Sequence, residues 1–176
     1  MAGEIAHLPI ALDGPNCPCG TWGCPARYIG RQLRLHTAGL DRFAETEGGE
    51  AALAELDRRL RAGDTGADAA LETAGHALGA AALRVAALRV AGVTDAGEIT
   101  LGGHLATWGE RLRPGLDARL VGRRALAPAM HPLITFGVLG AEATLRGASQ
   151  TCRDALLDDP TSVPIVPPAP VATPLP

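Results

Sequence analysis

The sequence predicts a helix-rich α/β fold in which short strands are outnumbered by helices. Apolar residues recur at spacings of three and four along several stretches, which is typical of helices that bury one face. Two short apolar segments, 99–101 and 133–136, indicate strands. A chain of 176 residues is long enough for one domain with a sizeable core.

The first part of the chain is expected to be extended and then helical. Residues 4–12 are predicted to be extended, and Pro9 makes this an edge or irregular strand. A helix is predicted over 26–36, ending at Gly39, and a second helix over 50–61. The arginines of the first helix indicate a solvated face, with phosphate binding as the alternative; they are Arg27, Arg31 and Arg34.

The longest helix is predicted over 67–91. Asp64 or Thr65 is expected to cap a helix rather than to bind phosphate, because helices lie on both sides of this turn. The small alanines of the long helix are expected to let it pack closely against a sheet. Its predicted apolar positions form a single stripe of Leu71, Ala74, Leu78, Ala81, Val85 and Leu88.

The C-terminal part is expected to hold two more helices and a tail. The helix that follows the first strand is predicted to break near Pro114, and the last helix spans 141–157. Residues 159–176 are rich in proline and are expected to be disordered or polyproline-like. The predicted division is therefore a domain over 1–158 and a tail over 159–176.

One histidine and three of the four cysteines gather in a loop over residues 7–24. The residues are His7, Cys17, Cys19 and Cys24. Three thiolates and one imidazole complete a tetrahedral shell, which is typical of structural Zn²⁺. The sequence therefore predicts a zinc-binding loop, and because such binding contributes folding free energy, removal of zinc is expected to unfold the chain.

The alternative for these cysteines is a disulfide or a set of unrelated buried thiols. Cys17 and Cys19 are too close in sequence to bridge each other comfortably, and an intracellular compartment keeps thiols reduced. Cys152 lies far away in sequence and is expected to be a small buried hydrophobe.

Composition excludes several classes of function. The net charge of −3 and the pI of about 5.9 give no electrostatic footprint for nucleic acid or an anionic membrane. The sequence contains no lysine, so a P-loop ending in Gly-Lys-Ser/Thr and Schiff-base chemistry are excluded. The N-terminus does not resemble a signal peptide and no segment offers about 20 uninterrupted apolar residues, so a cytoplasmic location without membrane contact is expected.

The segments AGEIAH and CPCGTWGC resemble the zinc signature of the ROK family, which groups bacterial sugar-responsive repressors with sugar kinases. The family pattern is A-G-E-x-G-H, a short hairpin and C-x-C-G-x-x-G-C-L-E. The resemblance extends over about residues 2–160. It implies the C-terminal half of an actin-like ATPase fold, which is ribonuclease H-like.

The resemblance also implies a sugar site. In the family, the residue matching Glu4 hydrogen-bonds sugar hydroxyls, and the one matching His7 both ligates zinc and approaches the sugar. A second sugar-contacting glutamate corresponds to Ala26, and Ala6 replaces a glycine. Alanine cannot accept a hydroxyl proton, and an unpaired buried hydroxyl costs roughly 1–3 kcal/mol. Sugar binding is therefore expected to be weak.

Gly102 and Gly103 resemble the V-V-L-G-G element of the family, which in the kinases lies beside the adenosine of ATP. Glycines between a strand and a helix allow a ligand to approach backbone N–H groups closely. A tight turn without a nucleotide is the alternative reading.

The first functional hypothesis is a non-catalytic, zinc-stabilised C-terminal fragment of a ROK-type sugar-responsive transcriptional regulator. The sequence starts immediately before the zinc signature and shows no Asp-x-Gly-Gly-Thr phosphate loop, no Asn-Asp pair and no winged helix, so no catalytic residue is assigned. Expected partners are a monosaccharide and either a missing N-terminal lobe or a second copy, without direct nucleic-acid binding. The alternative is a remnant or split piece of an ATP-dependent, glucokinase-like ROK sugar kinase. A third possibility is a zinc module for protein or nucleic-acid contacts, which the acidic pI disfavours.

Overall fold

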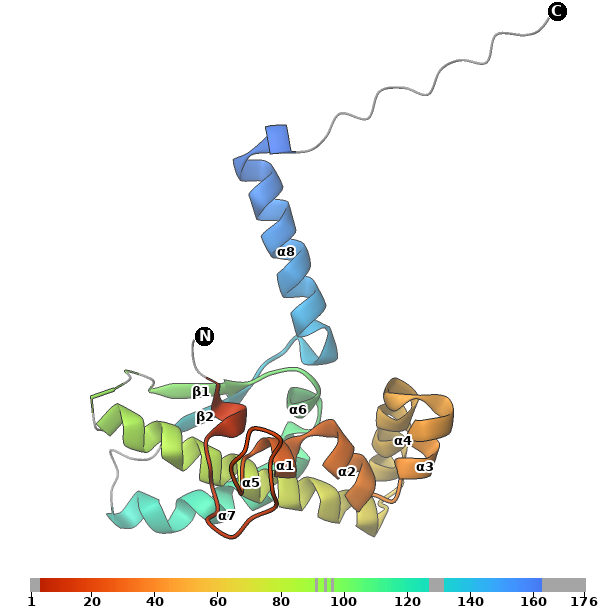
Figure 1. The fold of residues 1–176 in the computed structure, drawn as a ribbon, viewed down its shortest axis with the longest axis vertical. Coiled ribbons are helices and arrows are strands. Elements are labelled where there is room, and N and C mark those ends of the chain that lie inside the picture. The colour runs from red at the N-terminus through yellow and green to blue at the C-terminus, as the bar shows by residue number, and fades with distance from the viewer. Residues whose placement is uncertain (1–3, 91, 94, 96, 127–131, 163–176) are drawn as a thin grey trace, which may run out of the picture.

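The computed structural model describes residues 4–90, 92–93, 95, 97–126 and 132–162 (Figure 1). Helices dominate these residues, and two short strands form a small sheet, as the sequence predicts. None of the described helices combines the length and the apolar run that a membrane span needs. Of the proline-rich tail, residues 163–176 lie outside the described residues.

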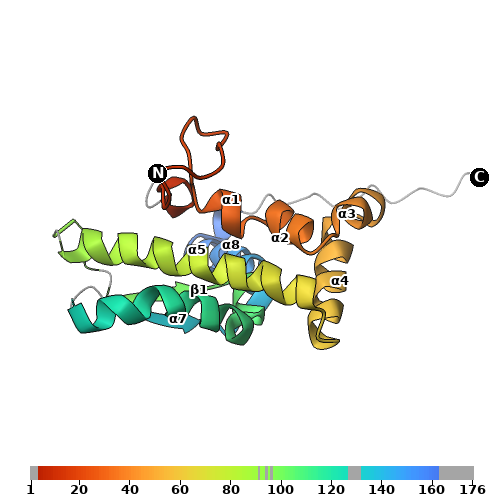
Figure 2. The same cartoon turned by 90° about the horizontal axis from the view of Figure 1, so that it is seen from below.

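Two long helices form the centre of the molecule. Helix α5 (Thr65–Val90) lies alongside α7 (Gly109–Leu126), and this is the most extensive contact between elements in the described part (Figure 2). A Cβ on Gly79 would lie 2.7 Å from the Leu116 carbonyl oxygen, so only glycine allows this approach. The small residues of α5 therefore allow the close approach of a second helix, which the sequence did not predict. Ile134 of the sheet belongs to the same buried cluster as Leu71 and Leu78 of α5, in line with the predicted packing on a sheet.

Burial on α5 covers more than the single predicted stripe. Leu71, Ala74 and Leu78 are buried as predicted, whereas Leu88 at the end of the stripe is 37% exposed. Helices α1 (Ala26–Ile29) and α2 (Arg31–Thr37) also pack on α5, so that its alanines are buried on further sides. An apolar stripe locates one contact face, but it does not say how many neighbours a helix has.

The predicted helix over 26–36 is two helices. The backbone is extended at Gly30 (φ −56°, ψ 149°), which separates α1 from α2. Helix α3 (Asp41–Glu47) was not predicted, and α4 (Gly49–Arg61) agrees with the prediction for 50–61 to within one residue. The predicted inner face of α4 is confirmed by the burial of Leu53, Leu56 and Leu60.

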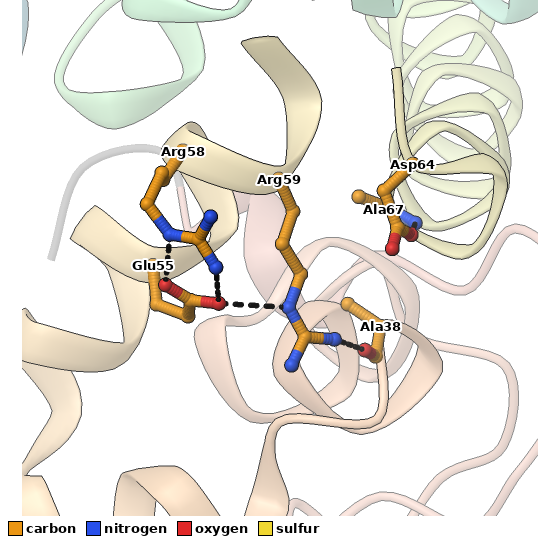
Figure 3. A network of polar contacts seen from close by, with 6 residues as sticks. All are labelled: Ala38, Glu55, Arg58, Arg59, Asp64 and Ala67. Carbon is orange, nitrogen blue, oxygen red and sulfur yellow. Dashed lines mark hydrogen bonds and ion pairs between the residues drawn. The ribbon is translucent and has the colours of Figure 1, made fainter. Parts of the chain in front are cut away.

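Polar contacts fix the junctions on either side of α4 (Figure 3). Arg59 donates one hydrogen bond to the Glu55 carboxylate at 3.0 Å and another to the Ala38 carbonyl at 2.9 Å, which ties α4 to the end of α2. The Asp64 carboxylate accepts a hydrogen bond from the Ala67 backbone N–H at 2.8 Å, so the predicted N-cap is confirmed.

The sheet consists of β1 (Glu98–Leu101) and β2 (Leu133–Phe136), which pair in parallel. Both strands agree with the prediction.

Helix α6 (His104–Thr107) and α7 connect the two strands, and α7 contains Pro114 without a break. The prediction that the helix breaks or restarts near this residue is wrong: Pro114 lacks only its own backbone N–H, and α7 continues on both sides of it. The interruption occurs instead at Trp108, between α6 and α7.

The C-terminal elements extend away from the body of the molecule (Figure 1). A short 3₁₀ turn, η3 (Gly140–Glu142), leads into α8 (Ala143–Asp158), and η4 (Pro160–Ser162) follows. Cys152 on α8 is exposed, so the prediction of a buried thiol is wrong. Helix α8 contacts chiefly η3 and η4, so the Cys152 side chain faces solvent rather than a core.

Candidate metal centre

The N-terminal loop is folded by backbone hydrogen bonds and by one sterically constrained glycine. The Ile10 N–H donates to the Gly23 carbonyl at 2.9 Å, and the Cys17 N–H donates to the Thr21 carbonyl at 2.8 Å. Gly23 has φ +64°, and a Cβ there would collide with the backbone of Ala11. Glycine at this position therefore lets the two sides of the loop meet.

The expected extended segment over 4–12 is only partly extended. Ile5–His7 form the 3₁₀ turn η1, and the backbone becomes extended at Leu8 (φ −80°, ψ 106°). The turn places His7 opposite the cysteine loop, since the Leu8 N–H bonds back to the Ile5 carbonyl at 3.1 Å. Local turn formation outweighs the strand-like composition here, because in the described residues this segment pairs with no strand of the sheet.

The four candidate ligands converge in space. The metal-binding atoms of His7, Cys17, Cys19 and Cys24 all lie within 4.8 Å of one another. The Cys17 Sγ lies 3.4 Å from His7 Nδ1, and the Cys19 Sγ lies 3.6 Å from the Cys24 Sγ. The three cysteines of this group are free thiols, so none of the disulfides considered as the alternative joins them.

Two of these separations are close to the edges of a tetrahedral coordination shell. Bonds of about 2.3 Å to sulfur and about 2.0 Å to nitrogen give S–S edges of about 3.8 Å and S–N edges of about 3.5 Å. The measured 3.6 Å and 3.4 Å are close to these values. Cys17 and Cys24 are buried whereas His7 and Cys19 are exposed, which leaves a route from solvent. The donor set can therefore hold a metal ion that prefers sulfur and nitrogen.

The thiols differ in acidity because of their hydrogen bonds. The side chain and backbone of Thr21 hydrogen-bond to Cys19 and lower the pKa of its thiol to about 6. The Thr21 side chain also favours the thiolate of Cys24, but burial and the neighbouring Cys19 and Cys17 outweigh it, so the pKa of Cys24 is raised. Three clustered thiols cannot all ionise without a cation, because like charges repel one another.

The residues assigned to sugar binding lie at the edge of this centre. Glu4 is exposed and immediately precedes η1, three positions before His7. The Nδ1 atom of His7 faces Cys17, which leaves Nε2 for another partner. Ala26 is half-buried at the start of α1.

Gly102 and Gly103 lie in the separate turn between β1 and α6. Gly103 has φ +63°, and a Cβ on either glycine would meet nothing within 4 Å. The turn is therefore open. Helix α6 has only four residues, so it contributes little of the dipole that favours anions at the start of longer helices.

Two features of the structure were missed in the sequence. The Thr21 hydroxyl lies 3.0 Å from the Cys24 Sγ and 3.3 Å from the Cys19 Sγ. The position of Thr21 in the sequence, between two candidate metal ligands, could have indicated these contacts. Arg34 is buried rather than solvated, with its guanidinium over the Trp108 ring at 5.0 Å. Sequence spacing could not reveal this pair, because Arg34 lies in α2 and Trp108 lies far along the chain, between α6 and α7.

The described residues form a helix-rich domain with a small parallel sheet and a loop that carries one histidine and three cysteines. This fold is shared with solved ROK sugar kinases. The chain belongs to the ROK family, which matches residues 1–155. The resemblance inferred from the sequence is thereby confirmed.

Two solved structures are similar to this chain. A ROK hexokinase from Thermus thermophilus is 27% identical with a TM-score of 0.53, over 89% of this chain and 49% of that one. A ROK family glucokinase from Streptomyces griseus, solved in complex with glucose and AMPPNP, is 23% identical with a TM-score of 0.60, over 87% of this chain and 52% of that one. This chain thus spans about half the length of each.

Proposed function

We propose that this chain is the zinc-stabilised C-terminal portion of a ROK-type sugar-responsive transcriptional regulator, with at most weak sugar binding and no catalytic role. The observation that carries the proposal is the convergence of His7, Cys17, Cys19 and Cys24 at separations that suit a tetrahedral ion. Four protein ligands leave no open position for substrate, which favours a structural role for Zn²⁺.

Zinc would connect parts of the chain that few other contacts hold. The ion would link η1 to the loop before α1, and bound Zn²⁺ would offset most of the negative charge of the three thiolates. His7 would bind through Nδ1 and present Nε2 outward, where it and the Glu4 carboxylate could hydrogen-bond sugar hydroxyls.

Weak rather than strong sugar binding follows from Ala26. The methyl group stands where the family has a carboxylate, so one sugar hydroxyl lacks its acceptor and roughly 1–3 kcal/mol of affinity is lost. A loosely held sugar is a greater handicap for phosphoryl transfer than for sensing, since transfer requires accurate positioning of the attacking hydroxyl.

The second candidate is part of an ATP-dependent sugar kinase. It is favoured by the open turn at Gly102 and Gly103, whose backbone a nucleotide can approach closely. The similar glucokinase was solved with glucose and AMPPNP, which supports glucose and ATP as the compounds to test.

The experiment combines metal analysis with a kinase assay on the same reduced preparation. We expect one zinc per chain, weak glucose binding that Glu4→Gln weakens further, and no phosphorylated sugar from glucose and labelled ATP. Glu110→Gln, which changes an exposed carboxylate on α7, serves as the matched control. Absence of zinc would refute the structural role, and phosphorylation above background would favour the kinase.

A further inference from the structure

Thr21 touches all three cysteines of the metal centre. Its Oγ1 lies 3.0 Å from the Cys24 Sγ and 3.3 Å from the Cys19 Sγ. Its carbonyl accepts a hydrogen bond from the Cys17 N–H at 2.8 Å. The residue itself coordinates nothing, so these contacts can act only through the ligands.

The hydroxyl contacts have a defined direction once a metal is bound. Each cysteine is then a thiolate and can only accept a hydrogen bond. A hydroxyl carries one proton, so Thr21 donates it to the nearer sulfur, that of Cys24, and its oxygen stays in contact with the Cys19 sulfur. One hydroxyl thus lies against both of the sulfurs that are 3.6 Å apart.

We propose that Thr21 is a positioning residue that raises metal affinity by holding the sulfurs of Cys19 and Cys24 at the separation that a tetrahedral ion requires. This role rests on the proposed zinc site. Partners of metal ligands orient them before the ion arrives, and loss of such a partner typically weakens metal binding by about 10- to 100-fold.

A purely structural role for Thr21 is the competing explanation. Its backbone carbonyl shapes the loop through Cys17, and any residue at this position can make that bond. Thr21→Val keeps the backbone and the branched shape but removes the hydroxyl, whereas Thr21→Ser keeps the hydroxyl. Since Thr21 is exposed, neither change opens a cavity in the core.

The test measures zinc affinity by competition with a chelator for the wild type, Thr21→Val, Thr21→Ser and the control Thr46→Val. Thr46 is an exposed threonine whose hydroxyl bonds only to backbone carbonyls of its own helix α3. We expect Thr21→Val to bind zinc about 10-fold more weakly than the wild type. Thr21→Ser and Thr46→Val should bind zinc as tightly as the wild type does. Cobalt(II) loading supplies a second readout, because the sulfur-to-cobalt charge-transfer band should shift in Thr21→Val alone.

The outcomes separate the two proposals. Unchanged affinity and spectrum in Thr21→Val, in a protein that binds zinc, would overturn the role of Thr21 and leave the zinc site standing. Equal losses in Thr21→Val and Thr21→Ser would overturn it too, since the hydroxyl would then be irrelevant. Absence of zinc from the wild type would overturn the zinc site and the role of Thr21 together.

Discussion

At the scale of single residues, Arg34 is an unusual part of the core. The side chain is buried, and its Nε and Nη1 atoms find no hydrogen-bond acceptor among the described residues. Burial and the nearby Arg31 lower its pKa to about 10, so it remains charged at neutral pH. The face of Trp108 stabilises this cation, and the indole N–H donates to Asp57 at 3.3 Å.

We expect Arg34→Met to leave the free energy of unfolding unchanged or to raise it by about 1 kcal/mol. Methionine fills much of the same space without an uncompensated buried charge. Trp108→Ala should instead cost about 3–5 kcal/mol, because it empties a buried site. Urea unfolding of both variants, with the exposed Arg42→Met as control, measures this. A loss above 1 kcal/mol in Arg34→Met would show that the contact of the guanidinium with the Trp108 ring outweighs the cost of burying its charge.

Glu55 gives the protein a specific dependence on pH. Hydrogen bonds from Arg58 and Arg59 lower the pKa of this carboxyl from its ordinary 4.5 to about 2 (Figure 3). A lowered folded-state pKa contributes stability above the unfolded value, and this contribution is lost as pH falls from about 4.5 to about 2.

Glu55→Gln should therefore be less stable than the wild type at pH 7, with a difference that shrinks below pH 4.5 and vanishes near pH 2. Urea unfolding at a series of pH values measures the difference, and Glu47→Gln on an exposed face is the control. A difference that stays constant over this range would contradict the assignment.

At the scale of elements, the pairing of α5 with α7 depends on glycines that let two backbones meet. A Cβ on Gly79 would lie 2.7 Å from the Leu116 carbonyl oxygen and 2.8 Å from the Arg119 Cβ. Neither atom is the free end of a flexible side chain. The helices would have to separate to admit a methyl group, and the leucines between them would lose contact.

Gly79→Ala should thus destabilise the protein by about 1–3 kcal/mol, although alanine favours helix more than glycine does. Gly122→Ala on α7 is the matched control, since a Cβ there meets nothing within 4 Å. The control should gain up to about 1 kcal/mol from helix propensity alone. Thermal melts of both variants measure the contrast, and stabilisation by both would contradict the close approach.

At the scale of the whole molecule, the metal centre lies beside the main core. The largest fully buried side chains, Cys24 apart, belong to the helices and their connections; they are Leu40, Leu56, Leu60, Leu71, Leu112 and Leu116. The main hydrophobic cluster includes none of the four candidate ligands. Removal of the proposed zinc ion should therefore loosen the N-terminal loop first, rather than unfold the whole chain as the sequence alone suggested.

Hydrogen exchange with and without a strong chelator tests this expectation. Amides of residues 4–25 should lose protection when zinc is removed, while those of α5 should keep most of theirs, because α5 packs in the leucine-rich core. The melting temperature should fall as well. Identical exchange in the N-terminal loop under both conditions would show that no bound ion holds it.

Local pattern determined much of this fold. Leu53, Leu56 and Leu60 share one helix face, the Asp64 cap follows from side-chain chemistry, and the cysteine spacing singled out the candidate ligands. These features are local because they depend on neighbours within a few residues, or on side chains with few alternative roles.

Tertiary structure alone decided the rest, because those features depend on which segments meet. Only the fold shows that the glycines of α5 face α7, that Arg34 lies over Trp108, and that Cys152 faces solvent. Sequence spacing identified the four candidate ligands, but packing of η1 against the loop brings His7 Nδ1 within 3.4 Å of the Cys17 Sγ. The sequence shows which contacts a side chain is able to make, and the residues that the fold brings next to it determine which contacts it makes.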